Sequence, residues 1–117
     1  MFKNGGEYER ALECHRKCLA NKLKRVGPED ISLAATYGNM ANVFDNQGDL
    51  EQALEHYRKV LPIELKAHGP EHPDVGNTYN NMAGVFRKQG DHERAMEHYR
   101  RFLATQEKAL GLSLIHI

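Results

Sequence analysis

Two thiols and one imidazole lie close together near the start of the chain and could bind a metal ion. Cys14, His15 and Cys18 share one predicted helix, and thiolate with imidazole is a ligand set that zinc accepts. The stretch lacks a fourth ligand, and helical periodicity places His15 and Cys18 on the inward stripe, where a thiol acts as a small hydrophobe. We therefore interpret these residues as core filling and predict neither a metal ion nor another cofactor.

The other residues that could do chemistry are spread over turns and outward helix faces. Four histidines are interpreted as surface residues and not as ligands: His56, His68, His72 and His98. The sequence contains no phosphate-binding glycine loop followed by Lys-Ser/Thr, no His-Glu-x-x-His and no nucleophile elbow. Acidic residues such as Glu51 and Glu93 stand beside lysines and arginines, as expected for a solvated, ion-paired helix surface. The chain is predicted not to be an enzyme.

The elements that must position these residues form an internal repeat. Residues 36–58, TYGNMANVFDNQGDLEQALEHYR, recur at residues 78–100 as TYNNMAGVFRKQGDHERAMEHYR. Aligned without a gap, residues 27–68 and 69–110 are identical at 22 of 42 positions. A period of this length predicts stacked supersecondary units, each of which is unable to bury its apolar face alone.

One repeat domain is expected over residues 1–111. It contains a partial repeat at residues 1–26 and two complete repeats at residues 27–68 and 69–110. Residues 112–117 are apolar and unrelated to the period, so we expect a disordered, non-repeat tail. Folding of this tail over the end of the last helix, as a cap, is the alternative.

Apolar residues recur at i, i+3, i+4 and i+7, which predicts helices. Five are expected: over residues 7–26 and 30–47, from Asp49 to the connector at Gly69, and over residues 73–89 and 91–110. Asp30 and Asp49 are predicted N-caps, and Pro62 is expected to kink the third helix because it removes one backbone donor. In the last helix, five side chains are expected to face the core: Ala95, Met96, Tyr99, Phe102 and Leu103.

The composition is that of an ordinary globular domain, with 40% hydrophobic and 27% charged residues. Sixteen basic residues balance sixteen acidic ones, so no net field favours nucleic acid or an anionic membrane. No run approaches the roughly 18 apolar residues of a membrane span. Two cysteines make no disulfide framework, which agrees with a reducing compartment. We predict a cytoplasmic protein that binds neither nucleic acid nor membrane.

The order of key residues resembles the tetratricopeptide repeat (TPR) signature, across Tyr37, Met40-Ala41, Phe44, Gly48-Asp49, Ala53-Leu54 and Tyr57. The usual unit has about 34 residues. The 42-residue period and the connector GPEHPDV resemble the longer repeats of kinesin light chain and related proteins. The resemblance implies an all-α, right-handed α-solenoid of antiparallel helical hairpins, with five helices plus the tail. Kinesin light chain's heptad segment is missing here, so a motor-linked role is not carried over.

In this family the first helix of each pair lines a concave groove that receives a peptide or a partner helix. By this resemblance the peptide-binding candidates are Asn39, Asn42, Asn80, Asn81, Arg87 and Lys88. Asparagine can bracket a peptide backbone because its amide both donates and accepts, and the two cations could pair with an acidic residue. We therefore predict a protein–protein interaction module of a scaffold or adaptor. The alternative is a structural spacer or self-associating segment of a longer solenoid, with end-to-end association.

Overall fold

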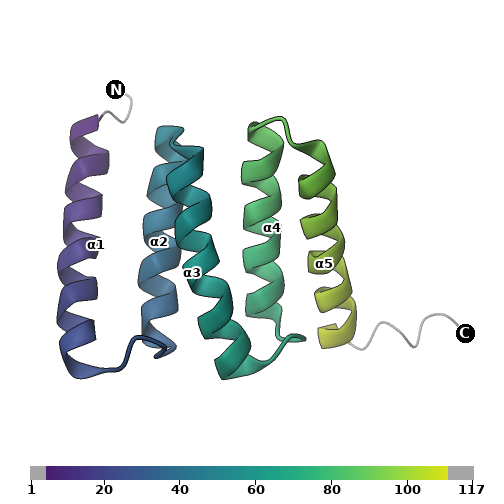
Figure 1. The fold of residues 1–117 in the computed structure, drawn as a ribbon, viewed down its shortest axis with the longest axis horizontal. Helices are drawn as coiled ribbons and strands as arrows, with labels where there is room; N and C mark the ends of the chain where they lie inside the picture. The colour runs from purple at the N-terminus through teal and green to yellow at the C-terminus, as the bar shows by residue number, and fades with distance from the viewer. Residues whose placement is uncertain (1–4, 111–117) are drawn as a thin grey trace, which may run out of the picture. The chain divides into compact units, whose positions relative to one another are not determined.

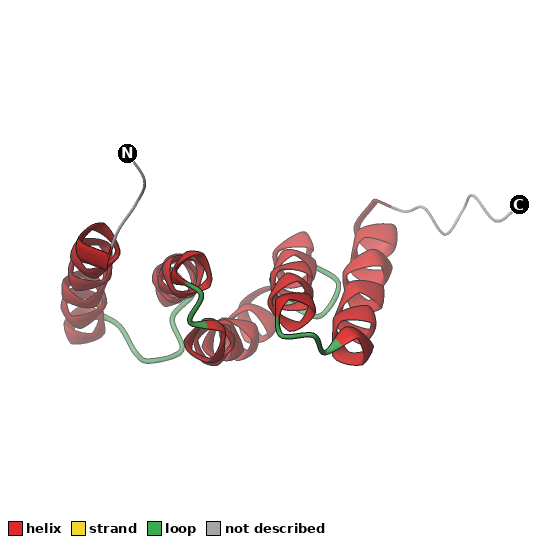
Figure 2. Ribbon diagram, turned by 90° about the horizontal axis from the view of Figure 1, so that it is seen from above, coloured by secondary structure: helices red, strands yellow, loops and turns green. Residues whose placement is uncertain are grey.

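The computed structural model describes residues 5–110, which form five helices and no strand (Figures 1 and 2). The helices are α1 (Gly5–Arg25), α2 (Ser32–Gln47), α3 (Leu50–His68), α4 (Pro73–Lys88) and α5 (His92–Leu110). They belong to two compact units, Met1–Ile63 and Glu64–Ile117. Each unit is described by itself below. The predicted all-α fold of antiparallel helices is confirmed, whereas the predicted tail lies outside the described residues.

The first unit contains α1, α2 and most of α3, and its core is built from the apolar stripes of these helices. Leu33 and Ala34 of α2 are buried against Val60 and Ile63 of α3, and partly buried side chains surround this cluster: Leu19, Val26 and Tyr37. The helix α3 continues through Pro62 to His68, so this proline does not end the helix. In this cluster, the buried residues are thus apolar positions that recur with helical spacing in the sequence.

The second unit contains the end of α3, followed by α4 and α5, which run antiparallel side by side (Figure 1). The buried side of α4 includes Val75, Val85 and Phe86. The two helices approach closely where Gly76 faces Thr105, since a Cβ atom added at Gly76 would lie 3.0 Å from the Thr105 Cβ. The position therefore has no room for a larger residue unless Thr105 moves.

The turn inside each hairpin is built the same way in both repeats. Gly48 has φ of 87°, and its N–H donates to the Asp45 carbonyl at 3.0 Å. A glycine tolerates this left-handed conformation without the steric cost of a Cβ atom. Asp49 then accepts the Gln52 N–H at 3.3 Å through its carboxylate, so the predicted Asp49 cap is confirmed. Gly90 and Asp91 repeat the arrangement.

The prediction of Asp30 as the N-cap of α2 was wrong by one position. The N-cap is Ile31, which already has helical φ and ψ of −60° and −28° and makes no side-chain cap hydrogen bond. Asp30 still serves the first turn, because its carboxylate accepts the Ser32 N–H at 2.9 Å. This hydrogen bond lowers the pKa of Asp30 below its usual value of 3.8.

Several positions expected to face inward are exposed. On α5, Met96, Tyr99 and Leu103 are 50%, 42% and 47% exposed, because the buried face of this helix runs instead through Ala95 and Thr105. Cys18 of α1 is also exposed, so its interpretation as core filling was wrong. In each case the apolar stripe of the sequence is wider than the face that a neighbouring helix covers.

Candidate functional site

The six predicted peptide-binding residues are all exposed. Asn39 and Asn42 lie on α2 in the first unit, and the others lie on α4 in the second unit: Asn80, Asn81, Arg87 and Lys88. A groove that uses both groups together therefore stays a prediction. Their common exposure is the property that a binding surface requires.

A surface hollow of about 420 Å³ brings Asn80 and Arg87 together. Gly84 and Ala83 of α4 form its floor with them, and α5 contributes the side chains of Ala95, Met96 and Tyr99. Asn81 and Lys88 do not line it. The hollow thus combines exposed apolar side chains with one amide and one guanidinium, which is the composition of a site that orients a partly apolar ligand by a few polar contacts.

Asn42 makes a contact inside its own unit. The Tyr57 hydroxyl of α3 donates a hydrogen bond to the amide oxygen of Asn42. Burial raises the pKa of Tyr57 to about 12, so this hydroxyl keeps its proton and remains a donor. The amide oxygen of Asn42 is therefore used inside the hairpin, and a role of this residue in peptide binding stays a prediction.

The interpretation of His56 as a surface residue was wrong, because the side chain is only 8% exposed. Its Nδ1 lies 2.8 Å from the Gln52 carbonyl oxygen one turn earlier, and its ring lies 5.0 Å from the Phe44 ring. Since a carbonyl can only accept, Nδ1 carries the proton. His98 repeats both contacts, with Arg94 at 2.9 Å and Phe86 at 4.9 Å. Both histidines join the two helices of a hairpin.

A buried threonine makes opposite polar contacts in the two units. In the first unit Thr36 accepts a hydrogen bond from the Lys22 ammonium at 3.0 Å. At the position 42 residues later, Thr78 donates to the Glu64 carboxylate at 2.7 Å. Burial is the main cause that raises the pKa of Glu64 above 4.5, and the hydrogen bond from Thr78 partly offsets it.

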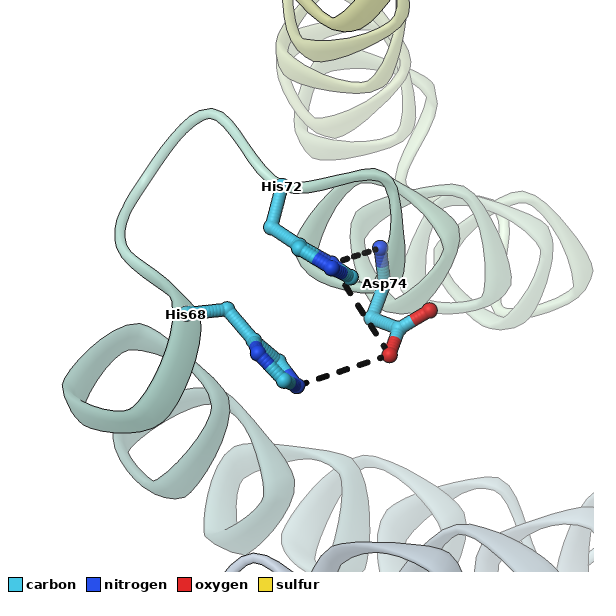
Figure 3. A group of neighbouring side chains, drawn as sticks. All are labelled: His68, His72 and Asp74. Carbon is cyan, nitrogen blue, oxygen red and sulfur yellow. Dashed lines mark hydrogen bonds and ion pairs between the residues drawn. The ribbon is translucent and has the colours of Figure 1, made fainter.

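The potential metal ligands that converge are not those near the start of the chain. Among residues 5–110, a set of three forms where α3 meets α4: His68, His72 and Asp74 (Figure 3). Sequence reasoning treated both histidines as isolated surface residues. The signal that could have found them is the spacing His-x₃-His-x-Asp around a connector that reverses the chain.

Antiparallel helical hairpins, joined by matching turns and repeated along the chain, define a helical-repeat protein. The tetratricopeptide repeat model matches residues 4–64 and again residues 32–108. The chain therefore belongs to the tetratricopeptide repeat family, which confirms the resemblance seen in the sequence.

Solved structures agree with this assignment. BtubC (BKLC) from P. vanneervenii is 26% identical with a TM-score of 0.76, and the match covers 88% of this chain and 41% of that one. The kinesin light chain-like TPR repeats from Podosopora anserina are 24% identical with a TM-score of 0.77, over 89% of this chain and 49% of that one. The chain spans less than half the length of either structure. No curated protein matches it significantly.

Within residues 5–110, none of the helices combines the length and the apolar character that crossing a bilayer requires.

Proposed function

We propose that this chain is a protein-interaction module that captures a peptide or a short helix of a partner, as part of a scaffold or adaptor. Tetratricopeptide repeats generally bind proteins, and this general role supports the proposal. The observation that carries it is the hollow between α4 and α5, where Met96 and Tyr99 stay about half exposed beside Asn80 and Arg87. Catalysis is no part of the proposed role.

The chemistry of the hollow selects the kind of ligand. Met96 and Tyr99 offer apolar surface to aliphatic or aromatic side chains, and methionine adapts to ligands of different shape. Arg87 supplies a planar cation that can bind a carboxylate through two hydrogen bonds. Asn80 can donate to and accept from the ligand backbone. The proposed partner is therefore a segment with apolar side chains next to an aspartate or glutamate.

The test is a screen of fluorescent peptides against the full chain, followed by affinity measurements with the best binder. Arg87→Glu should weaken binding of an acidic ligand by about tenfold or more, because attraction becomes repulsion. Arg100→Glu is the matched control, since this exposed α5 residue makes the same charge change outside the hollow. Equal effects of the two substitutions would contradict the assignment to the hollow.

The role of the asparagines needs a separate variant. Asn39 and Asn81 replaced together by alanine should lower peptide affinity while the far-ultraviolet circular dichroism stays unchanged, because both side chains are exposed. Unaltered affinity would remove these two residues from the binding surface and leave the hollow with Asn80 and Arg87 as the site.

A spacer or self-associating segment is the second candidate function, and one observation favours it. Met96 and Leu103 are exposed on α5, whereas Leu54, the counterpart of Met96 in the preceding repeat, is buried. An apolar stripe of this kind suits contact with another helix. Light scattering over a dilution series should detect association that Leu103→Glu abolishes. A chain that stays monomeric at all concentrations would exclude this candidate.

A further inference from the structure

The junction of α3 and α4 brings two imidazoles and a carboxylate to one point (Figure 3). His68 Nε2 lies 3.7 Å from Asp74 Oδ2, and His72 Nδ1 lies 3.8 Å from the same oxygen. The three candidate ligand atoms are all within 4.8 Å of one another. The side chains are 29%, 38% and 53% exposed, so a solute can reach them.

The two distances to Asp74 are informative because of their length. A gap of 3.7 Å is too long for a direct hydrogen bond. Two ligands of one tetrahedral ion, each about 2.1 Å from the metal, lie roughly 3.4 Å apart. The two separations from Asp74 are therefore a few tenths of an ångström longer than those of bound ligands, and the two imidazole nitrogens lie within 4.8 Å of each other.

The backbone holds the set in place from both sides. His68 is the last residue of α3, and the left-handed Gly69, with φ of 89°, reverses the chain so that His72 becomes the N-cap of α4. The two imidazole rings stack at 4.0 Å with 16° between their planes. Lys108 of α5 pairs with Glu71 in the connector at 3.3 Å. The three side chains thus converge without an ion, and one imidazole ring must turn out of the stack before both can bind the same ion.

Hydrogen bonding also sets the tautomer of His72. Its Nδ1 accepts the Asp74 backbone N–H at 3.0 Å, so the lone pair of Nδ1 is turned toward Asp74. A neutral His72 consequently carries its proton on Nε2, and Nδ1 is the atom able to bind a metal. This Nδ1 also lies 3.8 Å from Asp74 Oδ2, so a cation that displaces the N–H donor has the carboxylate beside it. Binding replaces one cap hydrogen bond with a metal–nitrogen bond.

The earlier repeat shows that capping alone does not require these histidines. The counterparts of His68, His72 and Asp74 are Val26, Asp30 and Ser32. Asp30 accepts the Ser32 N–H at 2.9 Å, which is the same cap contact made with a carboxylate. Valine fills the position of His68 without any polar role. The turn therefore needs one acceptor at the position of His72, which a carboxylate can supply, and it needs no imidazole at the position of His68.

We propose that His68, His72 and Asp74 form a binding site for a divalent transition metal ion, with zinc as the reference ion. Two imidazoles and one carboxylate match the ligands of three-coordinate protein sites that keep a position open for water or another ligand. The Glu64 carboxylate, one turn before His68 on α3, interacts electrostatically with His68 and Asp74 and adds negative potential. His68 and His72 also line a hollow of about 490 Å³ at the connector, through which an ion can reach them.

The experiment uses the full chain with Cys14→Ser and Cys18→Ser, because these exposed thiols could bind zinc independently. Zinc chloride is titrated by calorimetry, and the histidine ring signals are followed by nuclear magnetic resonance. We expect one ion per chain with a dissociation constant on the order of micromolar, and shifts at the His68 and His72 rings. Cobalt(II) should give the visible absorption of a low-symmetry site.

The matched variants separate ligation from folding. His68→Val copies the residue of the earlier repeat and should weaken zinc binding by about tenfold or more, as should Asp74→Asn. His92→Ala, at the exposed start of α5, should leave binding unchanged. Circular dichroism checks that every variant folds. The proposal is overturned if zinc shifts neither ring, or if His68→Val binds zinc as tightly as the parent chain.

Discussion

The Lys22–Thr36 contact of the first unit and the Glu64–Thr78 contact of the second occupy equivalent positions in the two repeats, yet their charges are opposite. Thr36 accepts from an ammonium at 3.0 Å, and Thr78 donates to a carboxylate at 2.7 Å. A hydroxyl can do either because it carries one donor and two acceptor sites. The two repeats therefore share the position of this contact, whereas the charged partner of the threonine is a cation in one repeat and an anion in the other.

The two contacts differ in how much they depend on the threonine. The Lys22 ammonium also donates to the Ser32 carbonyl at 3.0 Å, and its side chain is half-buried. Glu64 is only 9% exposed, and its hydrogen bond comes from Thr78. A buried carboxylate that loses its donor is costly, whereas a lysine with a second acceptor and access to water loses little.

The largest expected effect comes from removing the hydroxyl in each repeat. Thr78→Val should lower the free energy of unfolding by about 1–3 kcal/mol, because Glu64 is left buried without this donor. Thr36→Val should cost less than about 1 kcal/mol, since Lys22 keeps the Ser32 carbonyl. Urea unfolding of both variants measures the difference. Equal losses would show that the two contacts are energetically equivalent.

A second pair of variants compares the helix contacts next to these threonines. Ala34 of the first repeat corresponds to Gly76 of the second, where a Cβ atom would lie 3.0 Å from Thr105 Cβ and Cγ2. Gly76→Ala should therefore destabilise the chain by about 1 kcal/mol, in spite of the better helix propensity of alanine. Adding Thr105→Ser, which removes the nearest methyl group, should recover part of the loss in thermal unfolding. A stabilising Gly76→Ala would contradict the close approach.

The smallest effects concern pH, and Glu64 of α3 and Asp30 before α2 should change the stability with opposite signs. Burial raises the pKa of Glu64 above 4.5, so the favourable contribution of its protonated form is present at low pH and is lost as the pH rises through the raised pKa. Hydrogen bonding to Ser32 lowers the pKa of Asp30 below 3.8. The contribution of Asp30 is therefore present above 3.8 and is lost as the pH falls through its lowered pKa.

Chemical denaturation from about pH 3 to about pH 7 checks these signs. Relative to the native chain, Glu64→Gln should become more stable as the pH rises. As the pH rises through the acidic part of the range, Asp30→Asn should instead become less stable relative to the native chain. The reason is that only the native residue can ionise and gain this contribution. Parallel stability curves for native chain and variants would contradict both assignments.

Local signals allowed the fold to be predicted. The apolar spacing around Leu33 and Val60, and the Gly48-Asp49 turn, depend on residues within a few positions of one another. The exposure of Met96 could not be predicted in this way, because it depends on which helices lie next to α5. An apolar stripe in the sequence indicates which face of a helix can be buried, but it does not identify the neighbouring helix that packs on this face.

The peptide-binding role of the predicted residues stays a prediction. Asn80 and Arg87 were expected at the binding surface, and they line one hollow. The His68 and His72 cluster was missed because it depends on a chain reversal at Gly69. The partnership of Glu64 with Thr78 joins residues 14 positions apart on two helices. Such contacts become visible only when the path of the connector is known.

The burial of Tyr57 in the hairpin of α2 and α3 has a spectroscopic consequence. Tyr57 should ionise late, since burial raises its pKa to about 12. An alkaline titration followed by phenolate absorbance should thus contain a late step that belongs to this hairpin. That step offers a label-free reading of whether α2 and α3 remain together when the chain is diluted, mutated or bound to a partner.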